Sequence, residues 1–130
     1  DVLSGAAKRN KITMERRMER SKPDQAWVEL CAIDEVPEPA NGGKYIVHAN
    51  RSLAVFRCGD DAVCVLNDTC PHAGGSLSAG HVQGQCITCP WHGWTFDVHT
   101  GVCPDNSSIR AGSYLTRVVR GRVEALLDIV

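Results

Sequence analysis

The sequence predicts an all-β domain, either a sandwich or a small barrel of short antiparallel strands. Short runs rich in apolar and β-branched residues recur at close spacing from residue 27 to residue 128. Gly, Pro, Asn and Asp gather between these runs, at positions typical of turns. A long amphipathic helix pattern is lacking. The 130 residues, 43% of them hydrophobic, suit one globular domain.

Each expected strand is a short apolar run bounded by turn residues. The runs are residues 27–31, 44–48, 53–58, 62–67, 85–88, 95–98, 114–119 and 122–128. Three connections are short enough for hairpins: Asn50-Arg51, Gly59-Asp60-Asp61 and Arg120-Gly121. We recognise no internal repeat and no low-complexity tract.

Charge is divided unevenly along the chain, although the net charge is only −1. Residues 1–22 hold seven Lys and Arg against three Asp and Glu, which leaves seven basic and twelve acidic side chains for the remainder. This pattern predicts a loose N-terminal arm, residues 1–25, ahead of a folded domain, residues 26–130. The arm is either a solvated tail or a basic segment that steers a charged partner.

The composition also bears on location and partners. No apolar run approaches the roughly 20 residues that cross a bilayer, and the first residues lack the apolar core of a signal peptide. Seven Cys, an odd number at irregular spacings, are not typical of a disulfide framework. We therefore expect a cytoplasmic protein that binds neither membrane nor nucleic acid.

Two short motifs in the middle of the chain combine sulfur and nitrogen donors. They are Cys70-Pro71-His72 and Cys89-Pro90-Trp91-His92. Thiolates beside imidazoles suit zinc or an iron–sulfur cluster. In a Rieske centre two His replace two Cys on one iron of a [2Fe–2S] cluster, and one Cys and one His from each motif match that set. Structural zinc remains the alternative.

The residues around the motifs resemble the two cluster loops of Rieske-type ferredoxins. The resemblance is carried by Cys70-Pro71-His72-Ala73-Gly74-Gly75-Ser76-Leu77 and by Cys89-Pro90-Trp91-His92-Gly93-Trp94-Thr95-Phe96-Asp97, followed by Thr100-Gly101. It is also similar to the small Rieske subunit of assimilatory nitrite reductases. The resemblance implies a Rieske [2Fe–2S] fold, in which an antiparallel β-sandwich base carries a cluster-binding subdomain at about residues 69–98.

The same resemblance implies the ligands of one [2Fe–2S] cluster. Cys70 and Cys89 would hold the inner iron as thiolates, and His72 and His92 would hold the outer iron. Pro104 resembles the proline of the loop that covers the cluster in this family. No catalytic residue is implied.

Four positions differ from the high-potential members of the family. Gly75 and Trp91 stand where those proteins have two further cysteines joined in a disulfide. Trp94 and Phe96 stand where they have a Ser and a Tyr that donate hydrogen bonds to cluster sulfur and to a ligand thiolate. Such hydrogen bonds raise the potential, so we expect the low end of the Rieske range, about −150 to 0 mV.

The expected function is therefore one-electron transfer rather than catalysis. The chain has no room for a mononuclear-iron catalytic domain and lacks a Gly-rich dinucleotide fingerprint. The first hypothesis is a ferredoxin that passes electrons from a flavin reductase to a terminal oxygenase. The second is the small Rieske subunit of NAD(P)H nitrite reductase, working with its large subunit. The third is a structural zinc module without electron transfer.

The other cysteines and histidines have no assigned role. Cys31, Cys58, Cys64, Cys86 and Cys103 need no function, because free Cys packs as a small hydrophobe. Cys58 and Cys64 flank one turn, which makes a disulfide between them a minor alternative. A surface or cross-strand position is the default for His48, His81 and His99.

Overall fold

The computed structural model describes residues 24–59, 62–71, 74–91 and 93–128. The chain divides into two units, residues 1–27 with 126–130 and residues 28–125. In the described part of the first unit, Gln25 Nε2 donates to Asp128 Oδ1 at 3.1 Å. The predicted arm, residues 1–25, lies outside the described residues except for its last two positions.

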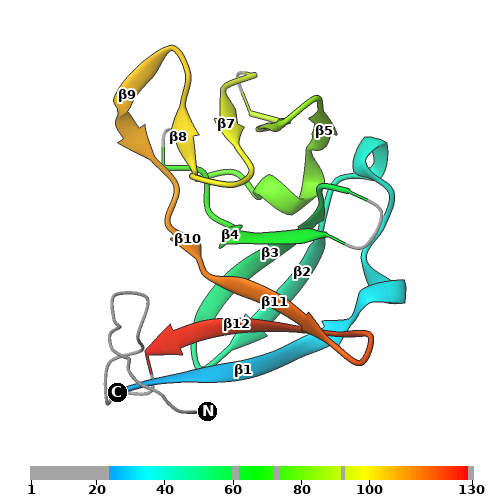
Figure 1. Cartoon of the computed structure of the whole chain (residues 1–130). Helices are drawn as coiled ribbons and strands as arrows, with labels where there is room; N and C mark the ends of the chain where they lie inside the picture. The colour runs from blue at the N-terminus through cyan, green and yellow to red at the C-terminus, as the bar shows by residue number, and fades with distance from the viewer. Residues whose placement is uncertain (1–23, 60–61, 72–73, 92, 129–130) are drawn as a thin grey trace, which may run out of the picture. The chain divides into compact units, whose positions relative to one another are not determined.

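Strands dominate the described residues, as predicted (Figure 1). The strands are β1 (Gln25–Ala32), β2 (Lys44–His48), β3 (Arg51–Arg57), β4 (Val63–Asn67), β5 (His81–Gln83), β6 (Cys86–Thr88), β7 (Thr95–Asp97), β8 (Val102–Cys103), β9 (Asn106–Arg110), β10 (Ser113–Tyr114), β11 (Thr116–Val119) and β12 (Arg122–Asp128). Three 3-10 helices, Ile33–Glu35, Pro39–Asn41 and Leu77–Ala79, are the helical elements of the described part. None of them is long and apolar enough to cross a membrane.

The second unit is organised around a four-stranded sheet of order β10-β4-β3-β2. A three-stranded sheet, β5-β6-β7, and the β8-β9 pair are formed by the residues that carry and follow the two motifs. Most of a further sheet, of order β1-β12-β11, also belongs to this unit. Every strand pairing whose register is given is antiparallel, which agrees with the Rieske fold expected from the sequence.

Two hairpins turn in two residues with positive φ. Ala49 and Asn50 have φ of 50° and 68°, and Arg120 and Gly121 have φ of 52° and 78°. Positive φ at both central residues is the geometry whose twist matches the flanking strands. The Arg120-Gly121 turn is as predicted, whereas the first turn lies one residue before the predicted Asn50-Arg51.

The core runs from the central sheet into the predicted ligand loops. Consecutive residues are buried in the middle of β3 and through most of β4, so both faces of the sheet are covered. On one face, Phe56 and Leu66 belong to the same cluster of buried side chains as Cys70, Cys89 and Phe96. The base therefore fixes the position of both cysteines through contiguous packing.

Candidate metal centre

The two predicted ligand loops share a backbone frame. In each loop the N–H of the cysteine donates to the carbonyl oxygen five residues further on. The pairs are Cys70 with Gly75 and Cys89 with Trp94, and both N···O distances are 2.7 Å. Each bond closes its loop over the residues that hold the predicted histidine.

A glycine with positive φ lies four residues after each cysteine. Gly74 has φ of 78° and Gly93 has φ of 73°, in the left-handed region that favours glycine. The N–H of Gly74 also donates to the Cys70 carbonyl oxygen at 2.8 Å. These glycines let the chain reverse tightly after each cysteine.

The ends of the loops correspond as well. Thr69 and Ser76 form an isolated antiparallel bridge, while Thr88 and Thr95 are partners across β6 and β7. Equivalent positions differ by nineteen residues, the difference between positions 70 and 89. The two loops thus correspond in their backbone from the residue before each cysteine to the residue after each closing bond.

The cysteines of the two loops meet in the interior. Cys70 is 1% exposed and Cys89 is fully buried, and their side chains are hydrogen-bonded to each other. Burial raises the pKa of the Cys89 thiol, the backbone N–H of Trp91 acts to lower it, and Cys70 raises it again. A metal at this position would be held by both side chains as thiolates, because thiols bind metal in the deprotonated form.

Gly75 leaves room beside Cys89 that a side chain would fill. A Cβ atom there would lie 3.3 Å from Cys89 Sγ and 3.0 Å from two ring atoms of Trp91. The Trp91 indole therefore lies across the first loop at the position where a cysteine side chain would project. A disulfide between positions 75 and 91 is absent for want of both thiols.

The buried carboxylate of Asp68 ties down the first loop. It accepts hydrogen bonds from Ser76 Oγ at 2.6 Å and from the Ser78 backbone N–H at 2.8 Å. The Asp68 carbonyl oxygen also accepts from the Leu77 N–H at 2.7 Å. This role of Asp68 was not predicted. The signal in the sequence was an acidic residue just before the first motif, with Ser76 and Ser78 a few residues after the motif.

A cavity of about 430 Å³ lies between the second loop and the β8–β9 turn. Trp94 and Thr95 line it from one side, and Cys103, Asp105 and Asn106 from the other. The turn that contains Pro104 is thus next to the second loop, and its covering of the cluster stays a prediction. Trp94 itself packs against the buried core.

His72 and His92 lie outside the described residues. The structure therefore brings together Cys70 and Cys89 among the four predicted ligands. Paired buried thiols, two matched loops and a space without a Cβ are a donor set that fits an iron–sulfur cluster. The described residues also bring together a second group, Cys58, Cys64 and His99, that was not predicted as a metal site.

The chain belongs to the Rieske [2Fe–2S] domain family, whose model matches residues 26–119. A domain of this class carries one [2Fe–2S] cluster, as predicted. Membership establishes the family of the chain and its cofactor, while the individual ligands remain assignments from the resemblance.

Among curated relatives, the ferredoxin subunit of anthranilate 1,2-dioxygenase from Burkholderia cepacia is 36% identical over 101 residues, which cover 75% of this chain and 89% of that protein. The cholesterol 7-desaturase of Hemicentrotus pulcherrimus is 33% identical over 80% of this chain. The match spans only 23% of the desaturase's length, so this chain corresponds to a small part of that protein.

Solved structures share the fold. A chain in the complex of reduced oxygenase and oxidized ferredoxin in carbazole 1,9a-dioxygenase has a TM-score of 0.66 at 31% identity, over 76% of this chain and 91% of that one. A Mycobacterium tuberculosis protein described as the small subunit of an NADH-dependent nitrite reductase has a TM-score of 0.71 at 25% identity, over 82% of this chain and 98% of that one.

Proposed function

We propose that the chain is a one-electron carrier, a low-potential Rieske ferredoxin without catalytic residues of its own. The observation that carries this proposal is the pair of matched loops that deliver Cys70 and Cys89 to one buried position, in a chain of the Rieske family. In this proposal both cysteines hold the inner iron, and His72 and His92 hold the outer iron. The bound cluster supplies one-electron redox chemistry.

The residues around the cysteines support a low potential. Phe96 is fully buried on β7, and Trp94 packs against the same core. Neither side chain has a hydroxyl group like those of a high-potential site. Fewer hydrogen bonds to sulfur leave the reduced state less stabilised. Protein-film voltammetry should give about −150 to 0 mV, and a value above about +200 mV would contradict the assignment.

The indole of Trp91 supports a docking role for the loop tip. It is 56% exposed, although it adjoins the buried Cys89 through Gly75. An exposed aromatic side chain is typical of surfaces that meet a partner. We infer a flavin-containing reductase as electron donor and a terminal oxygenase as acceptor, because relatives include a dioxygenase ferredoxin subunit.

A second candidate is the small Rieske subunit of NAD(P)H nitrite reductase, favoured by the TM-score of 0.71 to the mycobacterial small subunit. Affinity purification from native extract at low and high salt separates the two. A weak association that dissociates at about 0.5 M salt supports the ferredoxin, since screening at that ionic strength acts within a few ångströms. A stable complex with a large sirohaem flavoprotein supports the subunit and overturns the ferredoxin.

The ligand assignment is tested separately by His72→Cys and His92→Cys. Each substitution should alter or abolish the Rieske visible and electron-paramagnetic-resonance spectra, because nitrogen donors define the outer iron. His48→Cys, a histidine of β2, is the matched control and should leave both spectra unchanged. An unchanged spectrum in either ligand variant would refute that histidine as a ligand.

Two expectations remain. Membership of the Rieske family argues against zinc at Cys70 and Cys89. We also propose a reducing cytoplasmic location, because seven cysteines at irregular spacings are not typical of a disulfide framework.

A further inference from the structure

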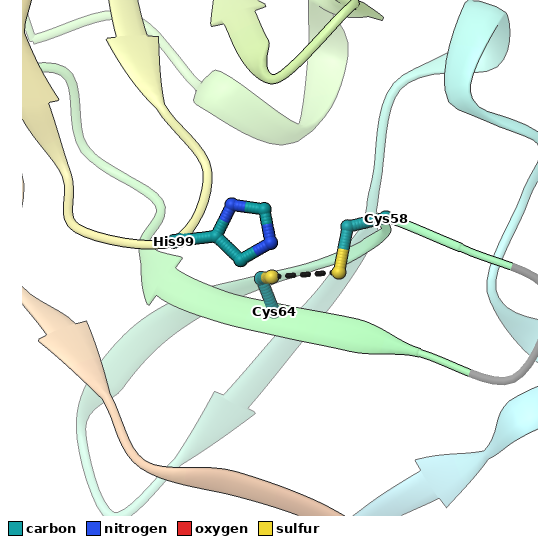
Figure 2. A group of neighbouring side chains, drawn as sticks. All are labelled: Cys58, Cys64 and His99. Carbon is teal, nitrogen blue, oxygen red and sulfur yellow. Dashed lines mark hydrogen bonds between the residues drawn. The ribbon is translucent and has the colours of Figure 1, made fainter.

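We propose that Cys58, Cys64 and His99 form a second metal site, separate from the cluster ligands, that binds one thiophilic divalent cation such as Zn²⁺. Their donor atoms all lie within 4.8 Å of one another (Figure 2). A zinc ion lies about 2.3 Å from thiolate sulfur and about 2.0 Å from imidazole nitrogen. Small rotations of these side chains would bring all three donors to such distances from one ion.

The fold assembles this site from two places far apart in the sequence. Cys58 follows β3 and its N–H donates to the Ala62 carbonyl oxygen at 2.9 Å, which holds it in the β3–β4 hairpin. Cys64 lies in β4, opposite Phe56. His99 comes from the turn after β7. A metal bound here would fasten that turn to the central hairpin.

The orientation of His99 suits a metal ligand. Figure 2 shows one ring nitrogen facing the two sulfur atoms. The other, Nδ1, lies 3.6 Å from Asp97 Oδ1, which leaves Nε2 on the side of the cysteines. Metal-bound histidines usually have a carboxylate or carbonyl oxygen at the nitrogen that does not touch the metal. Asp97 lies on that side of the ring, 3.6 Å away, and a small shift would bring it within hydrogen-bond distance.

The backbone holds Asp97 and His99 in register. Asp97 Oδ1 accepts from the His99 N–H at 2.7 Å and from the Thr100 N–H at 3.1 Å. The side chain of His99 is 48% exposed, whereas Cys64 is buried. The site thus has an anchored interior donor and an open side for entry of the ion. Three protein donors leave a fourth tetrahedral position for water.

The two sulfur atoms lie 2.8 Å apart, between the spacing of a zinc site and that of a disulfide. Zinc would require the sulfurs to move apart to about 3.8 Å, the tetrahedral spacing for bonds of about 2.3 Å. Cys58 is half-buried and packs against the core cluster, so a change of its rotamer would supply that movement and give up part of this packing. A disulfide would draw them together to about 2.05 Å and would give His99 and Asp97 no part. The aligned imidazole favours the metal.

Zinc binding to the cluster-loaded protein tests the site. The protein is incubated with ZnCl₂, passed through a desalting column, and analysed for iron and zinc together, and the affinity is measured by competition with a chromophoric chelator. We expect one zinc per chain in addition to about two irons. Cys58→Ser and His99→Ala should weaken zinc binding more than about a hundredfold, beyond the tenfold to hundredfold expected for Asp97→Asn as an outer partner.

Cys86→Ser and His81→Ala are the matched controls, because Cys86 is half-buried like Cys58 and His81 is exposed like His99. Both should keep the zinc, and full iron content shows that every variant is folded. Zinc should also raise the thermal midpoint of the wild type but not that of Cys58→Ser.

Several results would overturn the site. Three outcomes of the zinc measurements contradict it: the wild type retains no zinc, the zinc persists in Cys58→Ser and His99→Ala, or zinc is gained only at the expense of iron. A fourth contradicting result comes from peptide mapping after alkylation: a Cys58–Cys64 disulfide in protein purified without oxygen would replace the metal site with a covalent bond.

Discussion

The two ligand loops have one backbone frame but are held in place by different chemistry. The first loop is fixed by a polar network, in which the buried carboxylate of Asp68 accepts from Ser76 and Ser78. The second loop is the connection of the β6–β7 hairpin, and its Trp94 packs on the core. The same kind of turn is therefore stabilised by hydrogen bonds to a carboxylate in the first loop, and by strand pairing with apolar burial in the second loop.

The difference shows which residues define the site and which only support it. Both loops keep the cysteine N–H that bonds five residues ahead and the glycine four residues ahead. They differ at the next position. Gly75 leaves room for the indole of Trp91, whereas Trp94 has an indole of its own that packs on the core. Features common to both loops place the sulfur atoms, and the remaining residues shape the surroundings of the cluster.

The largest effect is expected from removing a common feature. Cys70→Ser and Cys89→Ser each delete one thiolate, so each should reduce the iron content from about two per chain to a trace. Iron analysis and the visible spectrum measure this loss. Cys31→Ser, a buried cysteine of β1, is the control and should keep full iron. Retention of the cluster in one loop variant alone would break the equivalence of the loops.

A smaller effect is expected from the polar support of the first loop. Asp68→Asn should lower the free energy of unfolding by about 2 kcal/mol, because the amide keeps one acceptor oxygen but replaces the other, to which Ser76 Oγ donates, with an NH₂ group. Asp97→Asn is the comparison after the second loop. Its carboxylate accepts two backbone N–H bonds at Oδ1, an oxygen that the Asn amide keeps, and it is 30% exposed, so the substitution removes less. We expect about 1 kcal/mol or less there.

Urea denaturation without added zinc measures both values. Equal losses for Asp68→Asn and Asp97→Asn would show that burial does not distinguish the two carboxylates. Faster loss of iron in Asp68→Asn than in Asp97→Asn would locate the weakness in the first loop.

Strong local signals made much of the fold predictable. Residues 44–48 and 122–128 were predicted with the bounds of β2 and β12, because each is an uninterrupted run between turn residues. Three short strands were missed: β5, β8 and β9 have two to five residues, and β9 is mostly exposed. Such strands depend on the partner that the folded chain supplies rather than on their own propensity.

The metal centre was predictable only where its chemistry is local. The motifs of Cys70 and Cys89 name the donors, but the shared frame depends on backbone bonds and on φ at two glycines. The role of Asp68 depends on serines brought to it by folding. Likewise, Cys64 and His99 are 35 residues apart, and no spacing rule relates them. Long-range assembly of this kind is visible only in the structure.

Gly75→Ala tests the contact between the loops. The new Cβ would lie 3.0 Å from the Trp91 ring and 3.3 Å from Cys89 Sγ, so the indole must move. Overpacking of this size should lower the free energy of unfolding by about 1–2 kcal/mol. Gly75→Ala should therefore shift the tryptophan emission of the wild type. The same substitution made in a Trp91→Phe background should shift the emission less. A full-sized shift without Trp91 would contradict the contact.

The smallest effect, and the sharpest comparison, is expected from Gly74→Ala and Gly93→Ala. At both positions a Cβ meets nothing within 4 Å, so the substitution costs only the left-handed φ. That cost is about 1 kcal/mol for each, and the two should agree within about 0.5 kcal/mol and be additive. Gly84→Ala, with φ of 63° and the same open surroundings, should cost as much. Because Gly84 lies in the β5–β6 turn, only the two loop variants should also release iron faster. Unequal losses for Gly74 and Gly93 would mean that the two turns are not equivalent, and that the shared frame is not what positions the sulfur atoms.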